Sequence, residues 1–114
     1  MIHEMKLKEI YYNKIKNGEK VYEIRLNDEK RKLIRVGDII IFKKEPELTD
    51  EIKTKVEELI FFKSFKEMAS FLPANKIGFD KINTNEIVNV YHEFYSKKDE
   101  QKFGVLAIKI KLSV

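Results

Sequence analysis

Residues 18–42 constrain the fold of this chain more than any other stretch, because they combine two strands with a strongly charged reversal. A glycine turn leads into residues 20–26, where Val, Tyr and Ile are good strand formers. A second turn, Gly-Asp, opens residues 38–43, whose nearly all-apolar sequence predicts a strand buried on both faces, as in a closed barrel. The segment therefore predicts two strands of a curved sheet with a charged bend between them.

The alternation of side chains along residues 20–26 separates a charged face from an apolar one. Lys20 has the parity of the apolar face, but it stands at the start of the strand. Its side chain therefore either bends toward Glu23 or extends into solvent. The charged face carries Val21, Glu23 and Arg25, and the apolar face, which belongs to the core, carries Tyr22, Ile24 and Leu26.

The same region holds the net positive charge of the chain. The sequence contains 23 Lys and Arg against 19 Asp and Glu, an excess of four. Residues 13–35 contain eight basic and four acidic side chains, so the remainder of the chain is neutral. A local basic excess favours polyanionic partners such as nucleic acid. A solvated surface that promotes solubility has the same composition, and charge alone does not separate the two.

The bend at residues 28–34 reads as one helical turn. Asp28 is placed to cap it, and Leu33 and Ile34 are expected on the core. Residues 48–62 fit both a helix and a strand, and their β-rich flanks favour the strand.

The remaining periodicities predict an ordered alternation of strands and short helices. The predicted elements are a strand at 2–7, a helix at 8–17, a strand at 51–63 with a bulge near 57–58, a helix capped by Ser64 and ended by Pro73, a helix at 85–95 capped by Thr84, a charged turn at 96–104 and a strand at 105–112. This order predicts an α+β fold, a small mixed barrel with helices covering its openings, in a single domain spanning residues 1–114.

Composition excludes several kinds of site. The chain has no cysteine, so it forms no disulfide, thiolate metal site or cysteine nucleophile. The only histidines, His3 and His92, argue against a multi-histidine zinc site and read as incidental. No phosphate loop, Ser-His-Asp set or metal-ligand spacing occurs, so we expect no cofactor. We expect a cytoplasmic protein, because no signal-peptide pattern or membrane-length apolar run is present.

A family resemblance is carried by the charged segment, at Gly18, Lys20, Glu23 and Arg25, then Leu26-Asn27-Asp28-Glu29-Lys30-Arg31, then Gly37-Asp38 and Phe42. These residues resemble the ASCH domain, named for activating signal cointegrator homology. Residues 3–7, 94–97 and 103–105 are similar to small stand-alone bacterial members of this family, so the resemblance covers essentially the whole chain.

The resemblance implies a PUA-like β-barrel that binds RNA or a nucleotide in a cleft lined by these polar residues. Some family members are assigned hydrolysis of an acetylated cytidine nucleoside or ribonuclease activity. The acetylcytidine hydrolases have a Lys at the position of Lys20 and a Thr at the position of Glu23. Here a carboxylate replaces that hydroxyl nucleophile. A carboxylate acts as a general base on water but does not stand in for a threonine nucleophile.

Five residues are therefore candidates for a ligand site. Arg25 is expected to contact a phosphate or base edge with its planar fork, and Lys20 to place positive charge beside an anion. Glu23 would accept from an amino group or, with Lys20, form the catalytic pair of a hydrolase. Arg31 is a candidate for the cleft rim, and Tyr95 for stacking on a base.

Simpler interpretations stand beside these roles. Glu23 and Arg25 also fit an exposed same-face ion pair of little energetic weight. Arg31 also fits a solvated face, and Tyr95 also fits a buried tyrosine with a satisfied hydroxyl. At the level of the whole protein, the alternatives are a nucleotide or RNA binder, a hydrolase of modified nucleosides or RNA, and a module that docks an acidic protein.

Overall fold

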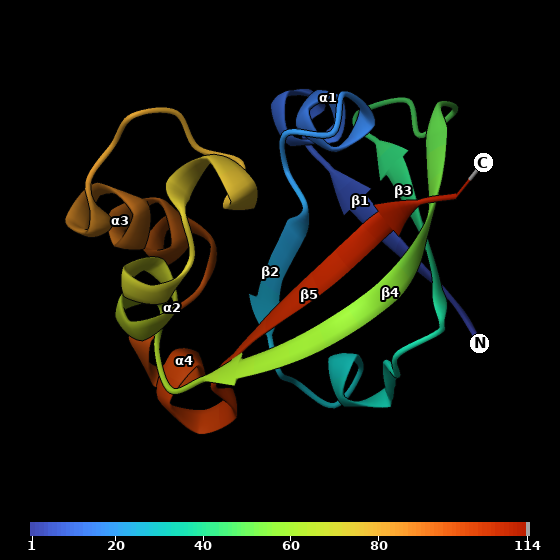
Figure 1. Cartoon of the computed structure of the whole chain (residues 1–114). Coiled ribbons are helices and arrows are strands. Elements are labelled where there is room, and N and C mark those ends of the chain that lie inside the picture. The colour runs from blue at the N-terminus through green and yellow to red at the C-terminus, as the bar shows by residue number, and fades with distance from the viewer. Residues whose placement is uncertain (114) are drawn as a thin grey trace.

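Five strands form one strongly curved mixed sheet in the computed structural model, which describes residues 1–113 (Figure 1). The order across the sheet is β1-β3-β4-β5-β2, with β1 and β3 parallel and the other neighbours antiparallel. The curl leaves β1 and β2 as its two edges. The strands are β1 (Ile2–Leu7), β2 (Tyr22–Leu26), β3 (Ile39–Lys44), β4 (Glu51–Phe62) and β5 (Val105–Leu112).

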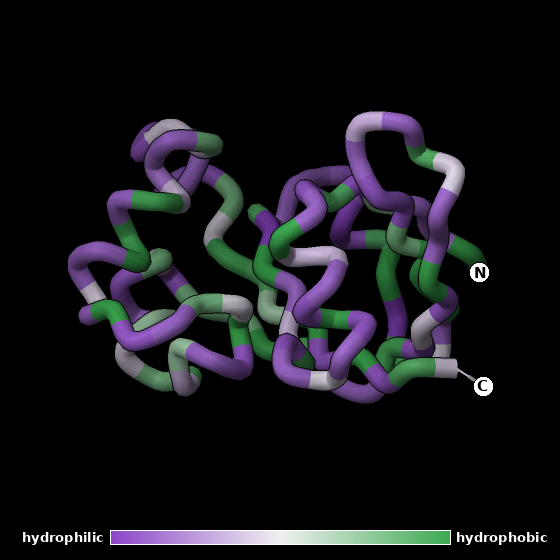
Figure 2. Tube along the Cα trace, turned by 90° about the horizontal axis from the view of Figure 1, so that it is seen from above, coloured by the Kyte–Doolittle hydropathy of each residue, from purple (hydrophilic) through white to green (hydrophobic). Residues whose placement is uncertain are grey.

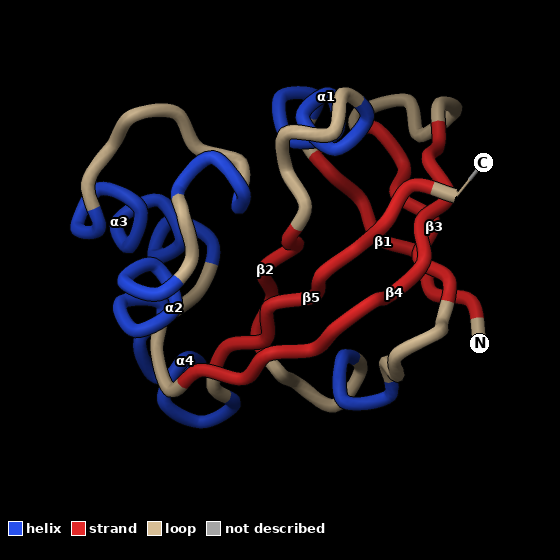
Figure 3. Tube along the Cα trace, in the orientation of Figure 1, coloured by secondary structure: helices blue, strands red, loops and turns tan. Residues whose placement is uncertain are grey.

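The helices fall into two groups. One helix, α1, covers an opening of the curled sheet, whereas the other three gather beside β2 and β5 (Figures 1 and 3). The prediction of an α+β fold, a small PUA-like barrel with helices, is confirmed. The helices are α1 (Glu9–Lys16), α2 (Phe65–Phe71), α3 (Thr84–Phe94) and α4 (Lys97–Phe103), with 3-10 turns η1 (Arg31–Leu33) and η2 (Ala74–Ile77).

Strand β5 separates two hydrophobic cores. Val105 and Ala107 pack against the helical layer, whereas Leu106, Ile108 and Ile110 face the interior of the curl. All five are buried, which explains the unbroken apolar sequence of this strand. Seen from above, the helical layer and the curled sheet are two lobes in contact along their middle (Figure 2).

The register of β2 on β5 decides which core each of its faces meets. Ile24 pairs with Ala107, and it contributes to the core under the helices. Glu23 pairs with Ile108, whose side chain belongs to the interior of the curl. The predicted split of β2 into a charged and an apolar face is confirmed. Because both sides of β2 are covered, its charged face is enclosed and not solvated.

Several local predictions hold and others fail at element ends. The bulge predicted near 57–58 is confirmed, because the β4–β5 register shifts between Val56 and Glu58. Asp28 caps the predicted turn by accepting from the amide of Arg31 at 3.0 Å. Ile34 is buried as expected, but Leu33 is 59% exposed because a single short turn presents only one of two successive side chains inward.

Two predictions about helix starts were wrong. The cap of α3 is Asn83 and not Thr84, because Asn83 and Glu86 form a reciprocal capping box. The charged stretch expected as a turn is the helix α4, which Ser96 caps by accepting from the amide of Asp99. Its inward residue Glu100 is buried and accepts from the amide of Phe65 at 2.7 Å. A buried carboxylate therefore anchors α4, although the charged composition of this segment suggested a solvent-exposed turn.

The turn before β3 ties down the N-terminus through Asp38. Its carboxylate accepts from His3 Nε2 at 2.8 Å and from the amide of Arg35 at 3.0 Å, so His3 is structural and not incidental. These two hydrogen bonds outweigh desolvation and lower the Asp38 pKa to about 2.

The variant Asp38→Asn is expected to lose about 1–2 kcal/mol of unfolding free energy at neutral pH, because asparagine accepts these bonds without charge. Because the pKa of Asp38 is lower in the folded state, the ionised carboxylate stabilises the fold at pH values above the ordinary carboxyl pKa of about 4. This contribution is lost as pH falls through about 2. Urea titrations from pH 6 to pH 2 should show the two proteins converging in acid. A gap that stays constant across this range would contradict the assignment.

Candidate functional site

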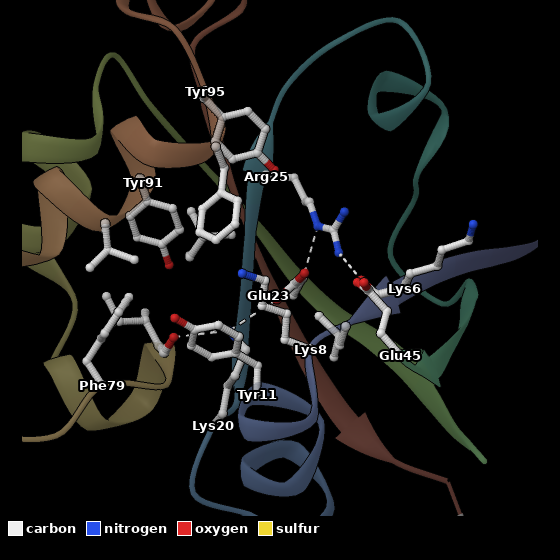
Figure 4. A pocket seen from close by; sticks show the side chains of 15 residues that line it. Lys6, Lys8, Tyr11, Lys20, Glu23, Arg25, Glu45, Phe79, Tyr91 and Tyr95 are labelled. Carbon is white, nitrogen blue, oxygen red and sulfur yellow. Dashed lines mark hydrogen bonds and ion pairs between the residues drawn. The ribbon is translucent and has the colours of Figure 1, made fainter. Parts of the chain in front are cut away.

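A cavity of about 330 Å³ lies where the two edges of the curled sheet meet the helical layer. Strand β2 forms its floor, and the end of β1 and the start of α1 form one wall. The opposite wall comes from α3 and the segment around η2. Figure 4 shows side chains from these elements converging on one space. The volume is within the range of about 300–1,000 Å³ that is typical of small-ligand sites.

A buried ion cluster occupies the floor. Glu23 stands at its centre, with Oε1 3.1 Å from Lys20 Nζ and Oε2 2.7 Å from Arg25 Nε. Lys20 is 3% exposed and Glu23 is 4% exposed, so both charges are removed from bulk water. The bend of Lys20 toward Glu23, one of the two alternatives, is therefore the one observed.

Lys20 is bound through all three of its donors. Besides Glu23, its ammonium donates to the carbonyl of Tyr22 at 2.6 Å and to the carbonyl of Ile77 at 3.1 Å. The Ile77 contact links β2 to η2 across 57 residues of sequence. Lys20 thus acts as a fixed positive charge that holds the floor of the cavity together.

Arg25 bridges the open seam of the sheet. Its Nε binds Glu23, and its Nη2 donates to the carbonyl of Lys6 on β1 at 3.0 Å. The two edge strands are thereby joined by a side chain. Among residues 1–113, the third nitrogen, Nη1, has no hydrogen-bond partner. It remains available as a donor to a ligand.

The charges of the cluster reinforce one another. Burial would raise the pKa of Glu23, but the nearby Arg25 and Lys20 charges and hydrogen bonds outweigh burial and lower this pKa. Burial lowers the pKa of Lys20, with Glu23 opposing it. Burial also opposes the charge of Arg25, but Glu23 outweighs it and raises the Arg25 pKa. With all three groups ionised, the floor carries one net positive charge.

Aromatic side chains form the rest of the lining. They are Tyr11, Phe79, Tyr91, Phe94 and Tyr95. Behind them, Phe65 stacks on Tyr91 with centroids 4.8 Å apart and on Tyr95 at 5.6 Å, which fixes the orientation of both rings.

Three tyrosine hydroxyls are left without protein partners. Within the described residues, those of Tyr11, Tyr91 and Tyr95 make no hydrogen bond, although Tyr91 is only 9% exposed. Burial, followed by the Glu23 carboxylate, raises the pKa of Tyr11 and of Tyr91. The hydroxyls therefore keep their protons at neutral pH. These hydroxyls are not enclosed, since within residues 1–113 the fully buried side-chain atoms without a partner are Asn27 Oδ1 and Arg31 Nε. The three hydroxyls are therefore open to bond to a ligand or water in the cavity.

The structure brings together four of the five residues singled out from the sequence. Lys20, Glu23, Arg25 and Tyr95 all line the cavity. Arg31 does not. Its Nη1 lies 3.5 Å from Asp28 Oδ2, three residues earlier, and the side chain is not part of the lining.

Sequence reasoning missed the opposite wall and the mouth. Tyr11, Phe79 and Tyr91 are not among the five candidate residues, although all three line the cavity. A tyrosine among inward apolar positions carries a hydroxyl that needs a partner, and that signal could have singled out Tyr11 and Tyr91. Nothing in the sequence pattern marks the remaining residues of the lining, which include Lys6, Lys8 and Glu45.

Within residues 1–113, no cluster of three or more His, Cys, Asp or Glu side chains is arranged to hold a metal ion. In the same part of the chain, no helix has the length and apolar character needed to cross a membrane.

Two solved structures are similar over nearly the whole chain. The crystal structure of hypothetical protein PH0355 superposes with a TM-score of 0.90 at 40% identity, covering 99% of this chain and 100% of that one. The solution NMR structure of protein PF0455 from Pyrococcus furiosus superposes with a TM-score of 0.78 at 34% identity, covering 98% and 97%. A search of curated proteins finds no match.

The family follows from a match to a sequence model. Residues 5–113 match the model of the ASCH domain, which confirms the resemblance drawn from the charged segment. Neither this match nor the similar structures support the expected bacterial type. The ASCH domain has a PUA-like fold that is associated with RNA binding. This chain belongs to the ASCH domain family.

Proposed function

We propose that this protein binds a nucleobase, presented by RNA or by a free nucleotide or nucleoside, in the cavity between β2 and α3. The observation that carries the proposal is the combination of aromatic faces with unpartnered donors in one enclosed space. Nucleobases present flat faces for stacking and a polar edge for hydrogen bonds. The family association with RNA supports the same ligand class.

Each part of the lining has a matching role. Arg25 Nη1 would donate to a ring nitrogen or carbonyl oxygen of the base, as arginine does at base edges. The hydroxyls of Tyr11 and Tyr91 would bond to other positions on the edge or to the ribose. Tyr95 already stacks on Phe65 with one face, which leaves only its other face and its edge for a ligand.

The geometry favours binding over hydrolysis. A general base works best when its pKa lies near the working pH. The two neighbouring cations lower the pKa of Glu23 and make it a weak base. Lys20 would have to release one of three acceptors before taking part in a reaction. Incubation with acetylated cytidine and with short RNAs checks this point, because product that disappears in Lys20→Ala would establish turnover.

The variant Arg25→Gln tests the binding proposal. Loss of the Arg25 Nη1 donor to the base edge should weaken nucleoside or RNA binding about 5- to 100-fold, measured by calorimetry at fixed salt. The matched control is Arg35→Gln, because Arg35 is exposed and does not line the cavity. Equal affinity of the Arg25 variant and the wild type, with both folded by circular dichroism, would contradict the proposal.

A further inference from the structure

The cavity carries more positive charge than a neutral base needs. Four cationic side chains and two carboxylates line it, an excess of two positive charges. One of these belongs to the buried cluster on the floor. The other belongs to the mouth, where Lys6 and Lys8 face only Glu45 among the carboxylates of the lining. A ligand that brings negative charge to the mouth would balance this excess.

Lys8 spans this mouth. It lies between β1 and α1, yet its ammonium lies 4.7 Å from the ring centroid of Phe94 at the end of α3. Both residues line the cavity. Among residues 1–113, no carboxylate pairs with Lys8 within salt-bridge distance. A cation over an exposed aromatic ring is held weakly, so a charge-assisted bond to an anion outcompetes this contact.

Lys6 is placed differently. Figure 4 shows its side chain directed away from the aromatic wall, while its carbonyl accepts from Arg25. Of the two lysines at the mouth, Lys8 is therefore the one held across the cavity.

We infer that the ligand is a phosphorylated nucleoside. Its phosphate binds Lys8 at the mouth, and Lys8 gives up its contact with the Phe94 ring to make this bond. This inference rests on the proposed base pocket, because the base places the phosphate there. The phosphate belongs either to a free nucleotide or to one residue of an RNA strand that crosses the mouth. In both cases Lys8 binds the phosphate, and the phosphate separates this ligand class from bare nucleosides.

Calorimetry on the full chain at 50 mM salt tests the inference. The probes are the four nucleosides, their 5′- and 3′-monophosphates, inorganic phosphate alone and single-stranded RNA tetramers. For the base that binds, one of the two monophosphates should bind about tenfold more tightly than the nucleoside. Lys8→Gln should abolish this gain, measured as the ratio of monophosphate to nucleoside affinity within the variant, whereas Lys8→Arg should keep most of it. Lys55→Gln is the control, because this exposed lysine of β4 removes the same charge outside the cavity.

Each outcome decides a different point. If nucleoside and monophosphates bind equally, or if Lys55→Gln reduces the gain as much as Lys8→Gln, the inference fails while the base pocket stands. If nothing binds, both fail. Tighter binding of a tetramer than of the monophosphate, again dependent on Lys8, supports a strand as the source. Equal binding of the two supports the free nucleotide. Binding of inorganic phosphate alone as tightly as the monophosphate would overturn the inference, because the base would contribute nothing.

Discussion

The variant Glu23→Gln is expected to lower the free energy of unfolding by about 3–5 kcal/mol at pH 7. Glutamine has nearly the same shape, so no cavity forms and the loss reports charge. Without the carboxylate, Lys20 remains buried beside Arg25 with neutral acceptors alone, the carbonyls of Tyr22 and Ile77 and the single oxygen of the glutamine, for which Arg25 competes. An uncompensated buried ammonium is the costly outcome, whereas Arg25 keeps its bond to β1.

A limit on this loss follows from proton release. Lys20 escapes its desolvation by losing a proton, which at pH 7 costs about 5 kcal/mol for a lysine with an ordinary unfolded pKa. Burial already lowers the Lys20 pKa in the wild type, and removal of Glu23 lowers it further. The unfolded state then binds more protons than the native state. The stability of the variant should therefore rise as the pH increases from neutral toward the ordinary lysine pKa of about 10.

Urea denaturation at pH 7, 8.5 and 10 measures both effects. Glu45→Gln is the matched control, because Glu45 lines the same cavity but is exposed and forms no ion pair within residues 1–113. It should change stability by less than about 0.5 kcal/mol. The double variant Lys20→Met/Glu23→Gln should recover most of the loss, since the unpaired charge is gone. If Glu23→Gln is as stable as Glu45→Gln at every pH, the cluster does not hold the floor.

The charged half of the cavity was predictable because it depends on short-range periodicity. Alternation along β2 places Glu23 and Arg25 on one face whatever the rest of the chain does. Lys20 was left with two alternatives, because its choice depends on the Ile77 carbonyl, which lies 57 residues away in the sequence. No local pattern indicates that this carbonyl is free to accept.

The aromatic half was not predictable for a different reason. Tyr91 has the spacing of a core residue, and it is one, since it packs on Phe65 and Phe79. Its hydroxyl nevertheless lies at the cavity. Helical periodicity shows which side of α3 points inward. It does not show whether the end of an inward side chain packs against other side chains or lines a cavity. Arg31 is the opposite case, because its charge predicted a place at the cleft, whereas it lies 3.5 Å from Asp28, three residues earlier, and outside the lining.

The fold itself was easier to predict than the site. The bulge in β4 was predicted from the charged pair at 57–58. Burial on both faces was predicted for residues 38–43, but Ile39 and Ile41 of β3 are only half-buried, and the strand buried on both faces is β5. The seam between β1 and β2 was not predicted, because a side chain closes it instead of a backbone ladder. A barrel could be predicted, but the place where it stays open, which is the place of the cavity, depends on register and curl.

Gly78→Ala is the second variant with a large expected effect, about 2–4 kcal/mol of lost stability. Gly78 ends η2 at a φ of 102°, a conformation that disfavours any side chain. An added Cβ would also lie 2.9 Å from Lys20 Cδ and 3.3 Å from Tyr11 Cδ1. A lysine stem usually moves aside, but three acceptors hold this ammonium in place, so the strain cannot relax without opening the cluster.

Gly37→Ala separates the two contributions. Gly37 has a similar φ of 96°, but no atom lies within 4 Å of the added Cβ, so this variant experiences backbone strain alone. It should lose about 1–2 kcal/mol and retain ligand affinity, whereas Gly78→Ala should lose more stability and weaken nucleobase binding. In a Lys20→Ala background, the excess cost of Gly78→Ala over Gly37→Ala should shrink. Equal costs of the two glycine substitutions in the wild-type background would show that Lys20 moves freely. The rigid floor on which the base pocket depends would then not exist.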